Sequence, residues 1–491
     1  MRPRSGGVFA LPGSGKVMVH YFKLGSWDRF ILLLLVFGLL QVPYHLFFQG
    51  ALVPELYWIR LGERMAQGWR LYAQAQTDTG PFPALVYAGL ARLGILDVAT
   101  LRYLATALVL AQALWLNRMA HKYQLITDRH FLLAFFYLIF AHVGPDALSL
   151  SPVLMATTFV LFATGRFFAI LKEGSGSDDT VVLGLWLGLA VACYQPAALF
   201  LFSFYTSALF FTGLRLNQYL QMLVAMLLPT AGVYVFFLVG GGEAEFWTCF
   251  LSPFRFKAIE SFVGWDLTIG IGGLLVLISL AGWAVANQNS RVNFQRLGFT
   301  VFFFSLIMAV LSIVPGASRS TDQLLFLVPH AAFFATQFML HTRGILMQEV
   351  LGLVLVLVFA GIFFGMADAN FGRQILGHRL LAEDPPKGFM ANFTGRSILV
   401  LADDARFIKH NPVATRYLRF GIAPTEPGWS QTHEGLIFWY QCLAEDPPAL
   451  IYDPQQQIPA LAVRIPEFGR CYKASFYPHL YEAIPGRRFG K

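Results

Sequence analysis

The sequence predicts an α-helical polytopic membrane protein of about 11 spans, with a small C-terminal extracytoplasmic α/β domain. Three observations support this prediction. Of the 491 residues, 56% are hydrophobic and only 13% are charged. The mean hydropathy is +0.57. Apolar runs of membrane-spanning length recur from residue 30 to residue 366, and frequent charged residues return only after them.

The low charge content excludes several classes of protein. Soluble proteins carry about 25% charged residues, so a disordered chain, a basic nucleic-acid binder and an ordinary cytosolic enzyme are all excluded. Residues 1–366 hold 22 Lys+Arg against 16 Asp+Glu, and residues 367–491 hold 14 against 12. The second part is about as charged as a soluble domain. We therefore expect a transmembrane domain over 1–366 and a water-facing domain over 367–491.

The predicted spans follow from bilayer thickness, because a hydrocarbon core of about 30 Å needs about 20 apolar residues. Eleven stretches qualify, and the third and fifth are short: 30–48, 101–119, 131–145, 152–170, 181–195, 197–213, 219–239, 266–286, 298–314, 323–341 and 347–366. The shorter apolar stretch 82–95 is predicted to form a helix at the membrane interface.

Basic residues predict the orientation. With a cytoplasmic N-terminus, the inner segments carry 14 Lys+Arg and the outer loops carry eight, as the positive-inside rule requires. An odd number of spans then places the C-terminal domain on the other side. We expect an inner-membrane protein with a cytoplasmic N-terminus and a periplasmic C-terminal domain. The first apolar run is expected to remain as a span, because no signal-peptide cleavage pattern follows it.

The large first outer loop, 49–100, is where charge returns near the membrane. Pro54 is predicted to begin a helix over 54–67, which Gly68 ends. The first part of the loop, residues 49–81, gathers three acidic and three basic residues: Glu55, Glu63, Asp78, Arg60, Arg64 and Arg70. Charges beside lipid are costly unless they are paired or functional. Two interpretations stay open, namely arginines that anchor to lipid phosphates with Glu63 paired to Arg60, or arginines that bind a substrate.

Later outer segments hold further candidates. Loop 240–264 combines Arg255 and Lys257 with several aromatic residues, which is typical either of an aromatic belt or of a polyprenyl-phosphate site. Arg319 and Asp322 in the short loop 315–322 could face the same cavity. His330 lies within a late span, where ionisable residues are suspected of function. The alternative is a neutral histidine hydrogen-bonded to a neighbouring helix.

Three motifs carry a resemblance to a known family. They are Pro54-Glu55-Leu56-Tyr57 in the first outer loop, Gly80-Pro81-Phe82-Pro83-Ala84-Leu85-Val86-Tyr87 before the interfacial helix, and Gly144-Pro145-Asp146-Ala147-Leu148 before the span 152–170. With this arrangement the chain resembles the GT-C superfamily of membrane glycosyltransferases. It also resembles multi-spanning proteins of the Bacteroidetes group, notably at 62–72 and in the C-terminal domain. The acid usual in the first loop is Asp, whereas the first loop of this chain has Glu55 and no adjacent acidic pair.

The resemblance implies a GT-C-like fold and a transferase activity. Such an enzyme would move a sugar from a polyprenyl-phosphate-linked donor to a glycan, lipid or protein acceptor on the periplasmic face, with inversion. Glu55 would be the base, and Asp146 would orient the acceptor or hold a divalent metal such as Mg or Mn. Because the planar guanidinium matches phosphate oxygens, the phosphate-binding candidates are the basic residues Arg60, Arg64, Arg70, Arg255, Lys257 and Arg319. Glu63, Asp78 and His330 are secondary candidates.

Two rival functions remain. The first is a non-catalytic membrane scaffold on the same fold that binds a lipid or a protein partner in a cell-envelope assembly. The second, a transporter, is less favoured because the sequence shows no inverted repeat. No nucleic-acid partner is expected.

The C-terminal domain reads as strand, helix, strand. Ser397–Leu401 and Ala449–Tyr452 are predicted as parallel strands around a helix over Glu434–Leu443, and Gln457–Tyr472 as a further helix. Acidic residues then follow the strands, where α/β folds bind ligands: Asp403, Asp404 and Asp453. Cys442 and Cys471 would pair in an oxidising compartment; two free buried thiols are the alternative.

Overall fold

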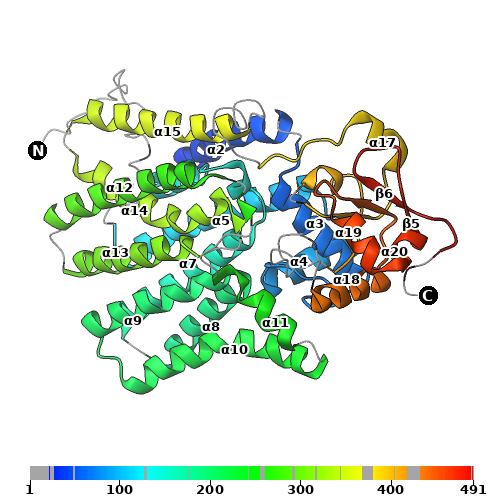
Figure 1. Ribbon diagram of the computed structural model, residues 1–491. Coiled ribbons are helices and arrows are strands. Elements are labelled where there is room, and N and C mark those ends of the chain that lie inside the picture. The colour runs from blue at the N-terminus through cyan, green and yellow to red at the C-terminus, as the bar shows by residue number, and fades with distance from the viewer. Residues whose placement is uncertain are drawn as a thin grey trace, which may run out of the picture.

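The computed structural model is a helical bundle with a small sheet-containing domain at one end (Figure 1). It describes residues 22, 27–47, 50–126, 130–174, 176–240, 243–254, 260–261, 263–289, 293–315, 318–342, 344–367, 380–402, 404–416, 418, 432–487 and 489. The C-terminal strands and helices lie beside α3 and α4, and the long helices extend away from them.

Each predicted span overlaps a helix in the described part of the chain, although residues 141–144 of the third span are not helical. The helices are α2 Trp27–Phe47, α5 Val98–Lys122, α6 Leu132–Phe140, α7 Pro152–Glu173, α8 Ser177–Cys193, α9 Phe200–Phe211, α10 Leu216–Gly240, α12 Trp265–Asn289, α13 Asn293–Ile313, α14 Val328–His341 and α15 Ile345–Ala367. In the described part of the chain, six of them are long and apolar enough to cross a bilayer: α5, α7, α10, α12, α13 and α15. The protein is thus a multi-pass membrane protein, and the count of about 11 spans stays a prediction.

Some spans are interrupted at the end near the C-terminal domain. Helix α6 has nine residues, or roughly 14 Å at 1.5 Å per residue, and the 3₁₀ helix η1, Pro145–Leu148, follows it. A second 3₁₀ helix, η4 Thr321–Phe326, precedes α14, and a third, η2 Gln195–Leu199, precedes α9. These short turns leave loop residues buried at one end of the bundle.

The first outer loop folds as predicted into two helices. Helix α3, Val53–Ala66, has Pro54 as its second residue, one position after its start. It is followed by Gly68, whose positive φ of 95° suits glycine at a helix end. Helix α4, Pro81–Arg92, covers the predicted interfacial stretch. Gly62 lets the two helices approach, since a Cβ there would lie 2.7 Å from the carbonyl oxygen of Tyr87.

Close helix packing in the bundle also depends on glycine. A Cβ on Gly184 or Gly188 of α8 would lie 2.4 Å from a carbonyl oxygen of α10, and one on Gly282 of α12 would lie 2.1 Å from the carbonyl oxygen of Phe334 on α14. Small residues at such contacts allow van der Waals packing between backbones, which stabilises helix association in lipid.

The C-terminal domain confirms the parallel strand pair and adds a hairpin. Strands β3 Ile398–Val400 and β4 Leu450–Tyr452 pair in parallel, with α18 His433–Glu445 between them in sequence. The predicted helix 457–472 is instead α19 Gln457–Arg464 and α20 Pro466–Cys471, broken at Pro466, which disfavours helix at the residue before it. Strands β5 Tyr472–Ala474 and β6 Leu480–Ala483 are antiparallel, giving the order β3-β4-β6-β5.

Shorter elements complete the chain: α11 Glu243–Phe250, the 3₁₀ helices η3 Ser252–Phe254 and η5 Ala405–Phe407, α17 Lys387–Phe393, and strands β1 Glu260–Ser261 and β2 Ser318–Arg319, which pair in parallel. Cys442 and Cys471 are buried, unpaired thiols. Asp404 caps η5, the side chain of Asp453 accepts a hydrogen bond from the Ile458 N–H, and Asp403 lies outside the described residues.

Candidate functional site

Glu55 lies in the first turn of α3 and is completely buried. Its carboxylate accepts two hydrogen bonds from Arg102 of α5, Nε to Oε1 at 2.9 Å and Nη2 to Oε2 at 2.8 Å. The Leu52 N–H donates a third bond to Oε2 at 2.8 Å. Arg102 also donates to the carbonyl of Gly50 at 2.6 Å. Bidentate hydrogen bonds between a guanidinium and a carboxylate are among the strongest side-chain contacts in proteins.

Asp146 and Asp322 form a second acidic centre. Asp146 lies in η1 and Asp322 in η4, and both are at most 5% exposed. The Asp146 carboxylate accepts from the Thr321 hydroxyl and, at 3.0 Å, from the backbone N–H of Asp322. Asp322 accepts from the Ser320 hydroxyl.

Burial and mutual repulsion make these carboxyls weaker acids. Burial raises the pKa of Asp146 above its usual value. Burial, together with the nearby charge of Asp146, raises the pKa of Asp322 to about 7. Two carboxyls that share a dry site cannot both ionise easily. The pair therefore retains a proton up to near-neutral pH, the range in which a general base works best.

Tyr44 lies between the two acidic centres. The Arg102 guanidinium lies 5.0 Å from the centre of its ring, and its hydroxyl donates to the Pro145 carbonyl at 3.0 Å. The end of α2 is thereby connected both to the Glu55–Arg102 pair and to the turn that carries Asp146. The structure brings the two predicted catalytic residues to one end of the bundle, on either side of this tyrosine.

Further polar groups surround the Asp146–Asp322 pair. Tyr87 of α4 donates its hydroxyl to the Leu150 carbonyl at 2.6 Å. Burial raises the pKa of Tyr87, and the charge of Asp322 raises it further. Tyr194 directly precedes η2, and its hydroxyl donates to the Pro315 carbonyl at 3.4 Å. The next residue, Gln195, is completely buried, and neither atom of its amide has a hydrogen-bond partner among the described residues.

Two of the predicted phosphate-binding arginines contact the C-terminal domain instead. Arg60 donates to the carbonyls of Ile408 and Lys409 and pairs with Glu63 at 2.7 Å. Arg64 pairs with Asp446 at 2.7 Å and donates to the carbonyl of Val413. Their guanidinium groups hold the C-terminal domain against α3.

The other predicted residues are less closely defined. Arg70 is exposed, after the end of α3. Burial raises the pKa of the Tyr72 hydroxyl, and the nearby Cys249 and Asp78 raise it further. Arg319 has its backbone in β2, while Arg255 and Lys257 lie outside the described residues.

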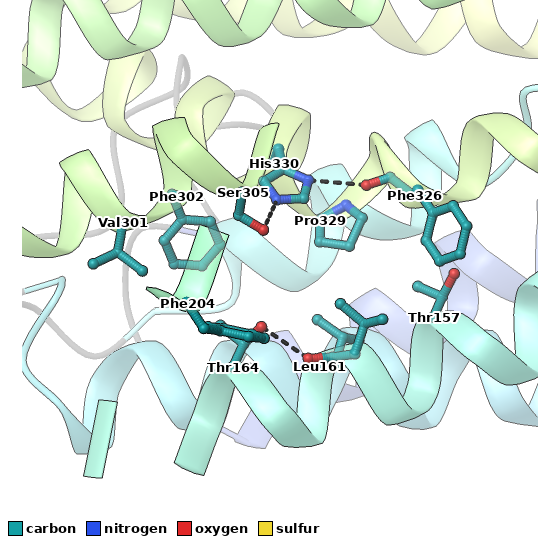
Figure 2. Close-up of a pocket in the computed structure, with 11 residues that line it drawn as sticks. Thr157, Leu161, Thr164, Phe204, Val301, Phe302, Ser305, Phe326, Pro329 and His330 are labelled. Carbon is teal, nitrogen blue, oxygen red and sulfur yellow. Dashed lines mark hydrogen bonds between the residues drawn. The ribbon is translucent and has the colours of Figure 1, made fainter. Parts of the chain in front are cut away.

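His330 is hydrogen-bonded within the bundle. Figure 2 shows its ring nitrogens bonded to the Ser305 hydroxyl and to the Phe326 carbonyl, both at 2.9 Å. The adjoining cavity, of about 10 Å³, holds at most a single water molecule. The contacts of His330 match the interpretation of a histidine bonded to a neighbouring helix, here α13.

A divalent metal finds no set of ligands in the described part of the chain, where no group of three or more His, Cys, Asp or Glu side chains is placed to hold one. The oxygens of Asp146 and Asp322 already accept bonds from Thr321 and Ser320. No chemical step is therefore assigned to a metal below.

Sequence reasoning did not select Arg102, Tyr44 or Gln195. Arg102 carried a usable signal, because it is a charged residue at the second position of the predicted span 101–119, where charge is expensive. Tyr44 and Gln195 carried none, because a tyrosine or glutamine at a helix end is common. Only the fold shows the contacts of Tyr44 and the burial of Gln195.

The fold is similar to that of solved membrane glycosyltransferases. ArnT from Cupriavidus metallidurans, bound to undecaprenyl phosphate, aligns with a TM-score of 0.57 and 12% identity over 94% of this chain and 99% of that one. The oligosaccharyltransferase AglB from Archaeoglobus fulgidus, in complex with an inhibitory peptide and a dolichol-phosphate, aligns with a TM-score of 0.48 and 12% identity over 94% and 75%. No family model and no curated protein sequence matches the chain. The chain thus shares the fold of the ArnT structure that is bound to undecaprenyl phosphate.

Proposed function

We propose that the protein is a membrane glycosyltransferase that moves a sugar from a polyprenyl-phosphate-linked donor to an acceptor hydroxyl, with inversion. The observation that carries the proposal is the buried Asp146–Asp322 pair at the end of a GT-C-type bundle. The ArnT structure, whose fold the chain shares, is bound to undecaprenyl phosphate. The acceptor, a glycan, lipid or protein, would approach from the side of the C-terminal domain.

In this reaction the acceptor oxygen attacks the anomeric carbon of the sugar, and the bond from that carbon to the phosphate oxygen breaks. The acceptor proton passes to a carboxylate, and polyprenyl phosphate leaves with the electron pair. A single displacement of this kind inverts the anomeric centre. We assign the base to the Asp146–Asp322 pair, because the pKa of about 7 at Asp322 suits proton transfer at neutral pH.

Glu55 has a different role in this proposal. Its carboxylate already accepts three hydrogen bonds, two of them from Arg102. Taking a proton would require loss of this pair, so Glu55 is better suited to positioning Arg102 and, through Tyr44, the Asp146 turn. The leaving phosphate stays assigned to the four remaining basic candidates of the sequence analysis: Arg70, Arg255, Lys257 and Arg319.

The test uses Asp146→Asn in liposomes supplied with undecaprenyl-phosphate-linked hexoses and pentoses, with release of undecaprenyl phosphate as the readout. Removing a general base costs roughly 100-fold or more in rate, so we expect at least that loss. Asp266→Asn is the matched control, because Asp266 is an exposed acid in the first turn of α12. Undiminished release by Asp146→Asn, with unchanged thermal unfolding, would refute the assignment.

A second candidate is the non-catalytic scaffold that binds a lipid or an envelope protein. The closed Glu55–Arg102 pair favours it, because the acid of the first loop is occupied by a side chain of the same protein. Under this alternative, wild type releases no undecaprenyl phosphate from any donor, although it still binds the lipid. Release by wild type that depends on Asp146 would exclude the scaffold.

A further inference from the structure

A cavity of about 480 Å³ lies between α5, α7 and α8. Its lining includes Arg166 of α7, which is 14 residues beyond Pro152 and therefore roughly 21 Å along the helix from the end that carries the Asp146–Asp322 pair. The cavity belongs to the opposite end of the bundle and takes no part in the proposed transfer reaction.

The polar side of the cavity is basic. Arg118 and Lys122 come from the last turns of α5 and Arg166 from α7, and no carboxylate is among the lining residues. Arg166 reaches Asp179 only at 3.6 Å, with half of its side chain exposed. Arg118 is exposed and has no ion pair or hydrogen bond with the described residues. The Lys122 ammonium donates to the Tyr123 hydroxyl at 3.1 Å, which leaves it further donors.

The apolar side of the cavity is aromatic and continues along the bundle. Trp115 and Phe162 are 5.2 Å apart, and Phe162 and Trp186 are 5.1 Å apart. The row continues from Trp186 to Phe159 at 5.9 Å and on to Phe82 of α4 at 5.4 Å. All five rings are only partly buried, so one edge of the row faces the surroundings of the bundle.

Gly165 shapes the cavity between these two sides. A Cβ at this position would lie 2.5 Å from the Trp115 ring, so any larger residue would displace the tryptophan. The absence of a side chain lets the Trp115 ring approach α7 closely, in the cavity that Arg118 and Arg166 also line. The basic groups and the start of the aromatic row therefore share one concave site.

We propose that this cavity binds an anionic glycerophospholipid of the leaflet opposite the Asp146–Asp322 pair. The headgroup phosphate would take charge-assisted hydrogen bonds from Arg118, Lys122 and Arg166, and an acyl chain would lie along the aromatic row. Basic pockets between transmembrane helices commonly bind anionic headgroups. If Arg118, Lys122 and Arg166 were only solvated surface charges, neither the cavity between them nor the aromatic row that leads from it would be needed.

The test is native mass spectrometry of the purified full chain after incubation with dioleoylphosphatidylglycerol or dioleoylphosphatidylcholine. Wild type should retain phosphatidylglycerol, and the double variant Arg118→Gln/Arg166→Gln should retain at least tenfold less. Arg215→Gln is the matched control, since Arg215 is exposed beyond α9 at the same end of the bundle and does not line the cavity. The control should bind as wild type does.

Two further arms keep the proposal falsifiable. Arg118→Gln alone alters a side chain that contacts no described partner, so it should fold normally and still lose phosphatidylglycerol several-fold. Inorganic phosphate, tested by thermal shift without lipid, should fail to replace the lipid. Equal retention by wild type and the double variant, or stabilisation by phosphate without retention of phosphatidylglycerol, would overturn the proposal. Neither result depends on transferase activity.

Discussion

The Glu55–Arg102 pair is an ionic contact with almost no exposure to solvent, 0% for Glu55 and 4% for Arg102. Removing one partner of such a pair leaves an uncompensated buried charge, which costs about 3–5 kcal/mol. We expect Arg102→Met to lower the free energy of unfolding by this amount. The double variant Glu55→Gln/Arg102→Met should recover about 2 kcal/mol or more, because Gln is neutral and still accepts from Leu52.

Chemical unfolding in detergent, followed by tryptophan fluorescence, would measure this double-mutant cycle. The control is Arg396→Met, which removes a partly exposed pair with Glu482 in the C-terminal domain and should cost less than about 1 kcal/mol. If Arg102→Met costs no more than Arg396→Met, the buried pair does not stabilise the fold.

Asp322 predicts a pH dependence of stability whose sign follows from its raised pKa. The unfolded chain has a carboxyl pKa of about 3.9, while the folded value is about 7. Between these values the folded state binds more protons than the unfolded state, so stability falls as pH rises from about 4 to about 7 and then levels off. Asp322→Asn should flatten this slope, and Asp266→Asn should not. Midpoints of thermal unfolding measured between pH 4.5 and 8 test this prediction. If stability changes with pH in Asp322→Asn as steeply as in wild type, the prediction is contradicted.

At the residue scale, the sequence motif at 144–148 identified Asp146 as a candidate, but only the fold shows that Asp146 contacts Asp322. The contact between Asp146 and Asp322 joins residues 176 positions apart. No local pattern relates two loop residues at that separation, so the raised pKa of Asp322 could not be anticipated. For Glu55, the capping position was readable from Pro54, but the bond to Arg102 depends on how α3 meets α5.

At the element scale, the contact between α3 and α4 depends on Gly62. A Cβ there would lie 2.4 Å from Leu96 and 2.7 Å from the Tyr87 carbonyl oxygen. Overpacking of this kind costs about 1–3 kcal/mol, so Gly62→Ala should lower the free energy of unfolding by that amount. Gly89→Ala in α4 is the control, because nothing lies within 4 Å of its added Cβ. Chemical unfolding should show Gly89→Ala unchanged or slightly more stable; equal effects would refute the packing role.

The helices and strands were predictable where a single hydrophobic pattern, or a single proline or glycine at a helix end, dominates the local sequence. The long apolar runs, the α3 boundaries at Pro54 and Gly68, and the parallel pair β3–β4 all follow from such signals. The prediction failed where the chain is short and irregular. The prediction of a single helix over 457–472 did not take Pro466 into account. The hairpin β5–β6 was not predicted, because strands of three and four residues show too little alternation of apolar and polar residues to be recognised.

At the scale of the whole molecule, charge is divided between the two ends of the bundle. The buried acids Glu55, Asp146 and Asp322 lie at the end that contacts the C-terminal domain, and the basic cavity of Arg118, Lys122 and Arg166 lies at the other. This division matches the basic bias of the predicted inner loops. It also separates the proposed transfer site from the proposed phospholipid site.

The C-terminal domain is held against α3 by a backbone pairing and by two arginines. Val53 donates its N–H to the Leu380 carbonyl and Ala382 to the Ala51 carbonyl, both at 2.9 Å. Arg64 reinforces this contact through its pair with Asp446. If the domain depends on these side chains for docking, their loss should expose the backbone pairing to solvent without unfolding either part.

We therefore expect Arg60→Ala/Arg64→Ala to speed amide hydrogen exchange at Val53 and Ala382 by at least tenfold, because exchange reports local opening. Amides in the middle of α7, which the C-terminal domain does not contact, should exchange as in wild type. Arg396→Ala is the control, since its pair with Glu482 lies within the domain and should leave the docking unchanged. Faster exchange in α7 would indicate general destabilisation, and unaltered exchange at Val53 would show that the backbone pairing alone holds the domain against the membrane part.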